Sequence, residues 1–173
     1  NKKTIINTMM DRIVHRGPNS SGEYIDKHVA LGFRRLSIID LEGGTQPIYN
    51  EDRTKIIIFN GEIYNYQPLR EELIAAGHVF QTHADTEVLL HGYEEWGTEL
   101  LQKIRGMFAF AIWDNEKNEL FGARDHFGIK PYYYAEMNGT FMFGSEIKSF
   151  LPHPDFNKEL NKEALKPYMT FQY

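Results

Sequence analysis

An amide, a glycine and a carboxylate follow one another in Asn60-Gly61-Glu62, directly after the apolar stretch 55–59. That stretch reads Lys-Ile-Ile-Ile-Phe, which is typical of a buried strand. An asparagine side-chain NH2 and a glycine N–H at a strand end are the two donors that an oxyanion hole needs. The carboxylate of Glu62 is suited to hold a substrate ammonium. The same Asn-Gly pair is also the commonest hairpin turn, and Glu62 alone is most often a solvated turn residue, so both interpretations stay open at this point.

Two more charged residues fit the same chemistry. Arg35 lies in an otherwise apolar segment, and its guanidinium is suited to bidentate capture of a carboxylate, although an ion pair with a neighbouring aspartate at the sheet rim is the alternative. Asp85 directly precedes a predicted helix, where an ordinary N-cap is the alternative. Together with Asn60 and Glu62, these residues predict a site for a zwitterionic amino acid.

Composition narrows the classes of protein. The 173 residues and 20.2 kDa suit one globular domain, and the net charge of −5 with interspersed signs excludes nucleic acid as an expected partner. No apolar run approaches the roughly 18 residues that cross a bilayer, so we expect no membrane partner and a cytoplasmic location. The chain has no cysteine, which excludes disulfides and a thiol nucleophile within these residues. The seven histidines form no cluster along the sequence, so no metal site is predicted.

The apolar periodicity and the turn residues predict the elements that position these side chains. We expect helices over 3–14, 68–76, 87–96 and 98–104, two strands within 22–40, further strands over 54–59 and 79–82, and a loop over 41–50. Pro68 suits the first turn of its helix, Gly97 suits a helix end, and Asp85 or Thr86 suits a cap.

The second half of the chain is mostly strand. The predicted strands are 107–113, 120–123, 132–136 and 141–143, with Asn138-Gly139 as a tight hairpin, followed by helices from Glu146 and from Lys162. Because the strands come in runs with short links, we predict an α+β fold with antiparallel sheets covered by helices.

Seven segments occur in an order that carries a resemblance. They are His15-Arg16-Gly17-Pro18, Arg35-Leu36-Ser37-Ile38-Ile39-Asp40 and residues 59–65, 84–87, 105–111, 123–131 and 143–148. In these segments the chain resembles the glutaminase domain of class II glutamine amidotransferases. The resemblance is greatest to the glutaminase domain of glutamine-hydrolysing asparagine synthetases. The resemblance implies an N-terminal nucleophile hydrolase fold, a four-layer αββα sandwich of two antiparallel sheets. It also implies that the first strand of that fold lies outside the residues given.

The resemblance further implies a reaction and a role for each residue. The side-chain amide of L-glutamine is hydrolysed, and the ammonia serves ATP-dependent synthesis of asparagine from aspartate. The implied roles are Asn60 and Gly61 as the oxyanion hole, Arg35 for the glutamine α-carboxylate, Glu62 and Asp85 for its α-ammonium, and backbone groups of Ile38 and Ile39 as pocket lining. For Arg16, anchoring a loop is favoured over touching glutamine, and its role stays open.

The nucleophile that the resemblance implies is an N-terminal cysteine whose own α-amine is the base. We therefore expect a segment with this cysteine to precede Asn1. Residues 1–160 are expected to form the glutaminase domain, and residues 161–173 to lead into a synthetase domain of the same polypeptide. ATP and magnesium are expected only in that domain, and no cofactor in this one. A non-catalytic glutamine-binding or regulatory domain, and a glutaminase serving another acceptor, are the alternatives. The sequence leaves homodimer formation open.

Overall fold

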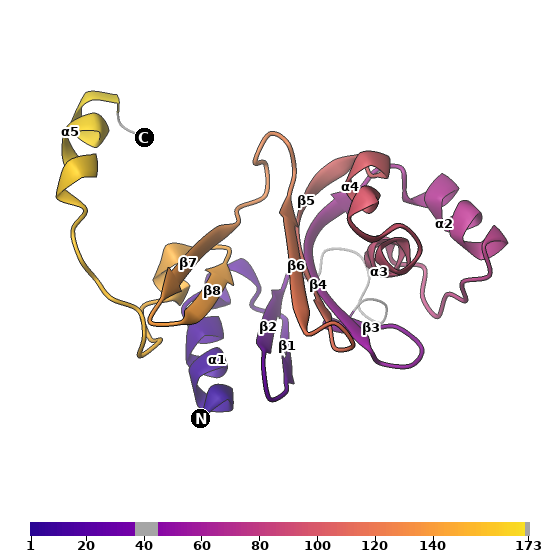
Figure 1. Ribbon diagram of the computed structural model, residues 1–173, viewed down its shortest axis with the longest axis horizontal. Coiled ribbons are helices and arrows are strands. Elements are labelled where there is room, and N and C mark those ends of the chain that lie inside the picture. The colour runs from indigo at the N-terminus through magenta and orange to yellow at the C-terminus, as the bar shows by residue number, and fades with distance from the viewer. Residues whose placement is uncertain (37–44, 172–173) are drawn as a thin grey trace.

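The protein is described by a computed structural model, which covers residues 1–36 and 45–171. Its elements stack in four layers (Figure 1): a helix, two β-hairpins, a four-stranded sheet and a second helical layer. All strand pairs are antiparallel. The predicted α+β sandwich, αββα in its layer order, is therefore confirmed.

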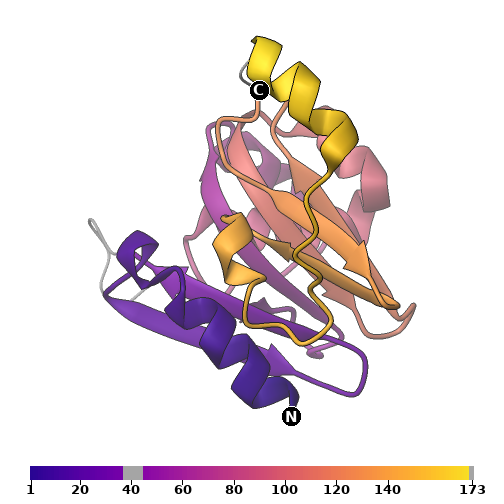
Figure 2. The ribbon, with the colours of Figure 1, turned by 90° about the vertical axis from the view of Figure 1, so that its left-hand side faces the viewer.

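The first two layers combine both ends of the chain. Helix α1 (Lys2–Asp11) covers the hairpin β1 (Ser20–Ile25)–β2 (Ala30–Arg35) and also reaches the hairpin β7 (Tyr133–Met137)–β8 (Thr140–Gly144) (Figure 2). Met9 of α1 packs with Met142 of β8 and with Phe150, which follows the 3-10 helix η3 (Ile147–Ser149).

The larger sheet has the strand order β3 (Ile48–Tyr49), β4 (Lys55–Ile63), β5 (Gly106–Asp114) and β6 (Glu119–Arg124). Its outer face is covered by α2 (Tyr66–Ala75), α3 (Asp85–Trp96), the 3-10 turn η2 (Gly97–Glu99) and α4 (Leu100–Lys103). Alternate residues of each strand point to one face. The face toward the helices is the main core, where Ile57, Ile63, Leu73, Leu89 and Leu90 are fully buried.

The inner face of the same sheet packs against the first hairpin. Ile56 and Trp113 contact Leu31 of β2, and all three are buried. The two hairpins and the sheet are thus joined by apolar side chains rather than by a continuous ladder of hydrogen bonds.

Several predicted elements are confirmed. Helix α1 begins one residue before the predicted helix 3–14 and ends three residues before its end, and a 3-10 turn η1 (Val14–Arg16) follows. The first hairpin turns at residues 26–29, where the N–H of Asp26 donates to the carbonyl of Val29 at 3.0 Å. Asn138 and Gly139 both have positive φ, 52° and 76°, as the predicted tight hairpin requires.

Other predictions were wrong. Residues 79–82 form no strand, because the carboxylate of Glu87 accepts hydrogen bonds from the N–H groups of Gln81 and Thr82 and so occupies donors that a ladder would need. Neither Asp85 nor Thr86 caps α3, which begins at Asp85 itself after Ala84. Only a 3-10 turn follows Glu146.

Two further boundaries also differ from expectation. Part of the predicted loop 41–50 pairs with β4 as the short strand β3, and α2 begins at Tyr66, before Pro68. At the other end of the chain, α5 (Lys162–Phe171) stands apart from the sheets and buries no side chain (Figure 1). The division at residue 160 stays a prediction. Within the described residues, no helix is both long and apolar enough to cross a membrane.

Candidate functional site

Asn60, Gly61 and Glu62 lie inside a strand, which rules out the hairpin turn. Strand β4 continues to Ile63, four residues beyond its predicted end, and pairs Asn60 with Ala109 and Gly61 with Phe108 of β5. A Cβ on Gly61 would lie 2.1 Å from the carbonyl oxygen of Met107. No side chain fits there, so the close approach of the two strands requires glycine.

The N–H of Gly61 faces away from β5. In an antiparallel pair, hydrogen-bonded and non-hydrogen-bonded residues alternate, and the N–H of Tyr64 donates to the carbonyl of Arg105. By this alternation Asn60 bonds to β5 and Gly61 does not. The residue paired with Gly61 is Phe108, whose N–H donates to Oδ2 of Asp125 and whose carbonyl accepts from the N–H of Asp125.

The neighbouring edge donors of β4 are both occupied by side chains. The N–H of Phe59 donates to Oε1 of Gln46 at 2.6 Å, and the N–H of Ile63 donates to Oδ2 of Asp85 at 2.8 Å. Between them, the N–H of Gly61 has no acceptor among the described residues, and neither does the side-chain amide of Asn60. Two hydrogen-bond donors are therefore uncommitted on adjacent residues.

Arg35 faces the same space between the sheets. Asn60 and Glu62 share the strand face of Ile56 and Ile58, which is turned toward the first hairpin, and Arg35 shares the face of Leu31, which packs against it. The adjacent Arg34 points the other way: its guanidinium pairs with Asp11 of α1 at 2.7 Å. The structure thus turns Arg35, Asn60 and Glu62 toward one interlayer space. Ile38 and Ile39 lie outside the described residues.

Asp85 is the first residue of α3 and meets the end of β4 through its bond to Ile63. Burial raises the pKa of its carboxyl, the N–H of Ile63 works against this, and the nearby carboxylate of Glu62 raises it further. Burial is the largest cause of the net upward shift, and the repulsion between the two carboxylates of this corner adds to it. The corner is therefore electrostatically suited to receive a cation.

Residues that sequence reasoning missed hold this strand in place. Gln46 completes both hydrogen bonds of Phe59, donating from Nε2 to its carbonyl at 2.9 Å. Asn65 ties the start of α2 to the residues before β5, since its Oδ1 accepts from the N–H of Arg105 and its Nδ2 donates to the carbonyl of Lys103. Asn65 could have been found from the sequence, because it ends the segment 59–65 that carries the family resemblance. Gln46 lies in none of those segments, and no local pattern indicates its role.

Two histidines that lie far apart in the sequence come together in the outer helical layer. His78, which follows α2, lies beside His91 and Glu94 of α3. Burial disfavours the charged ring of His91, but the carboxylates of Glu87 and Glu94 outweigh it and raise its pKa to about 9. The spacing Glu87-x-x-x-His91-x-x-Glu94 places all three on one helix face, which the sequence shows in retrospect.

Arg16 belongs to a separate ionic group. Glu146 accepts from His15 at 2.8 Å and pairs with Arg16 at 3.4 Å and with Lys148 at 3.0 Å. Burial works against the charged carboxyl, but Lys148, His15 and Arg16 hold the pKa of Glu146 at about 2. The group joins the turn after α1 to the residues after β8, which agrees with an anchoring role for Arg16.

Comparison with known proteins identifies the class. Residues 1–173 match the glutamine amidotransferase domain family, and the chain belongs to that family. It is 54% identical over 172 residues to asparagine synthetase [glutamine-hydrolyzing] 1 of Bacillus subtilis, covering 99% of this chain and 27% of that protein. It is 45% identical over 139 residues to asparagine synthetase B of Escherichia coli, covering 80% of this chain and 25% of that protein. The chain thus spans about a quarter of the length of these relatives.

Solved structures agree on the fold. The glutamine phosphoribosylpyrophosphate amidotransferase of B. subtilis superposes with a TM-score of 0.66 and 21% identity, over 85% of this chain and 40% of that one. An enzyme described as the allosteric regulatory enzyme of purine biosynthesis gives 0.60 and 26%, over 71% of this chain and 29% of that one. The architecture is therefore that of the N-terminal nucleophile amidotransferases.

Proposed function

We propose that this chain is the glutaminase domain of a glutamine-hydrolysing asparagine synthetase of the cytoplasm. It hydrolyses the side-chain amide of L-glutamine and supplies ammonia to a synthetase domain of the same polypeptide, where ATP, magnesium and aspartate bind. Membership of the amidotransferase family and the 54% identity to a B. subtilis asparagine synthetase support this assignment.

The observation that carries the proposal is the pair of uncommitted donors on β4. An oxyanion hole works when rigid donors wait for the charge that develops on the substrate oxygen. The side-chain NH2 of Asn60 and the backbone N–H of Gly61 fit this role, because both project from a buried strand and neither has an acceptor among the described residues. The proposal requires a cysteine nucleophile, and none of residues 1–173 is a cysteine.

The remaining residues hold the two ends of glutamine. The guanidinium of Arg35 pairs with the α-carboxylate in a bidentate geometry. Glu62 and Asp85 hold the α-ammonium, whose positive charge offsets the repulsion between their carboxylates. Each end of the amino acid thereby meets opposite charge.

The test is glutamine hydrolysis by the full-length protein. Asn60→Ala is expected to lower kcat about 10²–10³-fold with little change in thermal stability, because one oxyanion donor is lost while no described hydrogen bond is broken. Arg35→Ala is expected to raise KM, with Arg34→Ala as its matched control, since Arg34 pairs with Asp11 on the opposite face.

The outcomes separate the alternatives. Unchanged kcat in Asn60→Ala contradicts the oxyanion assignment. Glutamine binding without ammonia release by the wild-type protein contradicts the enzyme and favours a regulatory glutamine-binding domain. Glutamine-dependent amidation of an acceptor other than aspartate leaves the glutaminase intact and contradicts only the synthetase assignment.

A further inference from the structure

Two imidazole rings and a carboxylate converge in the outer helical layer, away from the polar residues of β4. The nearest ligand atoms of His78, His91 and Glu94 all lie within 4.8 Å of one another. Nδ1 of His91 and Nδ1 of His78 face the same oxygen, Oε2 of Glu94, at 2.8 and 3.8 Å. Two ring nitrogens and one carboxylate oxygen are a ligand set that zinc commonly takes in proteins.

The opposite nitrogen of each ring also faces a carboxylate. Nε2 of His78 lies 3.1 Å from Oε2 of Glu95, and Nε2 of His91 lies 3.6 Å from Oε1 of Glu87. The Nε2 of His91 is buried without a hydrogen-bond partner among the described residues. Metal-binding histidines almost always direct their second ring nitrogen at a carboxylate, carbonyl or water, which orients the ring and increases its basicity.

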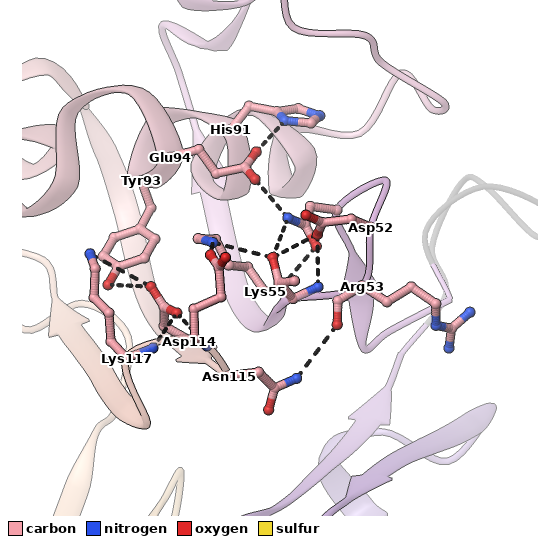
Figure 3. Close-up of polar contacts among 12 residues, drawn as sticks. Asp52, Arg53, Lys55, His91, Tyr93, Glu94, Asp114, Asn115 and Lys117 are labelled. Carbon is pink, nitrogen blue, oxygen red and sulfur yellow. Dashed lines mark hydrogen bonds and ion pairs between the residues drawn. The ribbon is translucent and has the colours of Figure 1, made fainter.

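The carboxylate ligand is held as well. Oε1 of Glu94 accepts a hydrogen bond of 2.7 Å from Nδ2 of Asn50, in the turn between β3 and β4. Figure 3 shows Glu94 between the ring of His91 and this turn, with Lys55 nearby. Lys55 is itself paired with Glu116 at 2.6 Å. One oxygen of Glu94 is therefore positioned by the fold, while the other faces the two rings.

Burial and spacing suit an ion with one open position. The side chain of His91 is 1% exposed, while those of His78 and Glu94 are 17% and 19% exposed, which leaves an approach from solvent. The rings of Phe80 and His91 pack edge to face, with their centroids 4.6 Å apart. Ligands bound at 2.0–2.1 Å in a tetrahedron lie about 3.3 Å apart, so side-chain shifts of about 1 Å complete the geometry.

We propose that Nδ1 of His78, Nδ1 of His91 and Oε2 of Glu94 form a binding site for one divalent transition-metal ion of the zinc class, with water as the fourth ligand. The ion takes the place of the proton between His91 and Glu94. It ties the segment after α2 to α3, whose first residue, Asp85, bonds to β4. Asp85 and Glu94 are nine positions apart, or about 13 Å along the helix, so the ion is structural and does not touch the substrate.

The test uses full-length protein that has been stripped with a chelator. Zinc chloride is titrated by calorimetry, and cobalt(II) is added to a second sample as a spectroscopic probe of tetrahedral nitrogen and oxygen ligation. The wild-type protein is expected to bind one equivalent of zinc. The variant His78→Gln is expected to bind zinc at least a hundredfold more weakly and to lose the cobalt absorption, because replacing a metal ligand weakens binding more than replacing one of its hydrogen-bond partners does.

His15→Gln is the matched control, because His15 also lies 2.8 Å from a glutamate but belongs to the separate group around Glu146. It is expected to retain the full stoichiometry. Glu94→Gln is a second variant that keeps an oxygen for the hydrogen bond from Asn50, and circular dichroism establishes that both variants are folded. Equal stoichiometry and affinity in the wild type and the folded variants overturns the proposal and leaves a cluster of ion pairs. Because glutamine turnover is not the readout, the result is independent of the proposed function.

Discussion

The buried carboxylate of Asp125 supports strand β5 where it pairs with Asn60 and Gly61 of β4, and replacing this carboxylate tests that support. The residue follows β6 and is 5% exposed, and its carboxylate accepts four backbone hydrogen bonds. Oδ1 accepts from the N–H groups of Phe127 and Ile129, at 3.1 and 2.9 Å, and Oδ2 from those of Phe108 and Lys130, at 3.3 and 2.9 Å. Phe108 is the residue paired with Gly61, so Asp125 supports the strand beside the proposed oxyanion hole.

Asp125→Asn keeps the shape but turns an NH2 group toward two of the four N–H donors. A buried donor without an acceptor costs about 1–3 kcal/mol, and some relaxation of the exposed loop is expected, so the variant should lose about 2–4 kcal/mol of stability. Asp11→Asn is the control, because the side chain of Asp11 is 69% exposed and its carboxylate is largely hydrated. That change should cost less than about 1 kcal/mol.

The assay is native-state hydrogen exchange of residues 106–130 in the full-length protein. A loss of 2–4 kcal/mol corresponds to protection that falls roughly 30- to 1,000-fold. Backbone hydrogen bonds outweigh burial and lower the pKa of Asp125 below its usual 3.8. The stabilisation is therefore present above about pH 4 and is lost as pH falls through the lowered pKa, so the difference between variant and wild type should narrow in acid. A change in protection under threefold at pH 7 would refute the reasoning.

Three further predictions concern packing and charge. Gly61→Ala should destabilise the fold by more than about 3 kcal/mol, because the added Cβ would lie 2.1 Å from the backbone of β5. Gly139→Ala should cost only about 1 kcal/mol, because a Cβ there would meet nothing within 4 Å. Thermal melts of the two variants measure the difference. Glu146→Gln should lower the melting temperature at pH 7 but not near pH 2. The pKa of Glu146 is about 2, so its carboxylate stabilises the fold above about pH 4.5, and this stabilisation is lost as the pH falls through 2. Equal melting differences at both pH values would contradict this. Leu73→Ala, at a fully buried position of α2, should cost about 2–5 kcal/mol in urea unfolding, and a loss below 1 kcal/mol would show that α2 packs loosely.

Much of the fold could be predicted because its signals are local. The alternation of apolar residues in β4 and β5, the Asn138-Gly139 turn and the runs of strand with short links are all read within a few residues. Wrong predictions arose where a distant group decided the outcome. Residues 79–82 have the composition of a strand, yet the Glu87 carboxylate takes two of their N–H groups. Strand propensity depends on residues 79–82 alone, so it cannot indicate that a side chain of the next helix will accept hydrogen bonds from their N–H groups.

The candidate site divides in the same way. The sequence by itself determined which chemical groups are present: an amide and a glycine in succession, an arginine on an apolar strand, and carboxylates in the segments 59–65 and 84–87. Only the tertiary structure decided that Asn60 and Gly61 lie within a strand, and that Gln46 and Asp85 occupy the edge donors on either side of Gly61. It also decided that His78 meets His91 and Glu94. The physical reason is that a donor or a ligand is defined by what surrounds it, and those neighbours are brought together only when the layers pack.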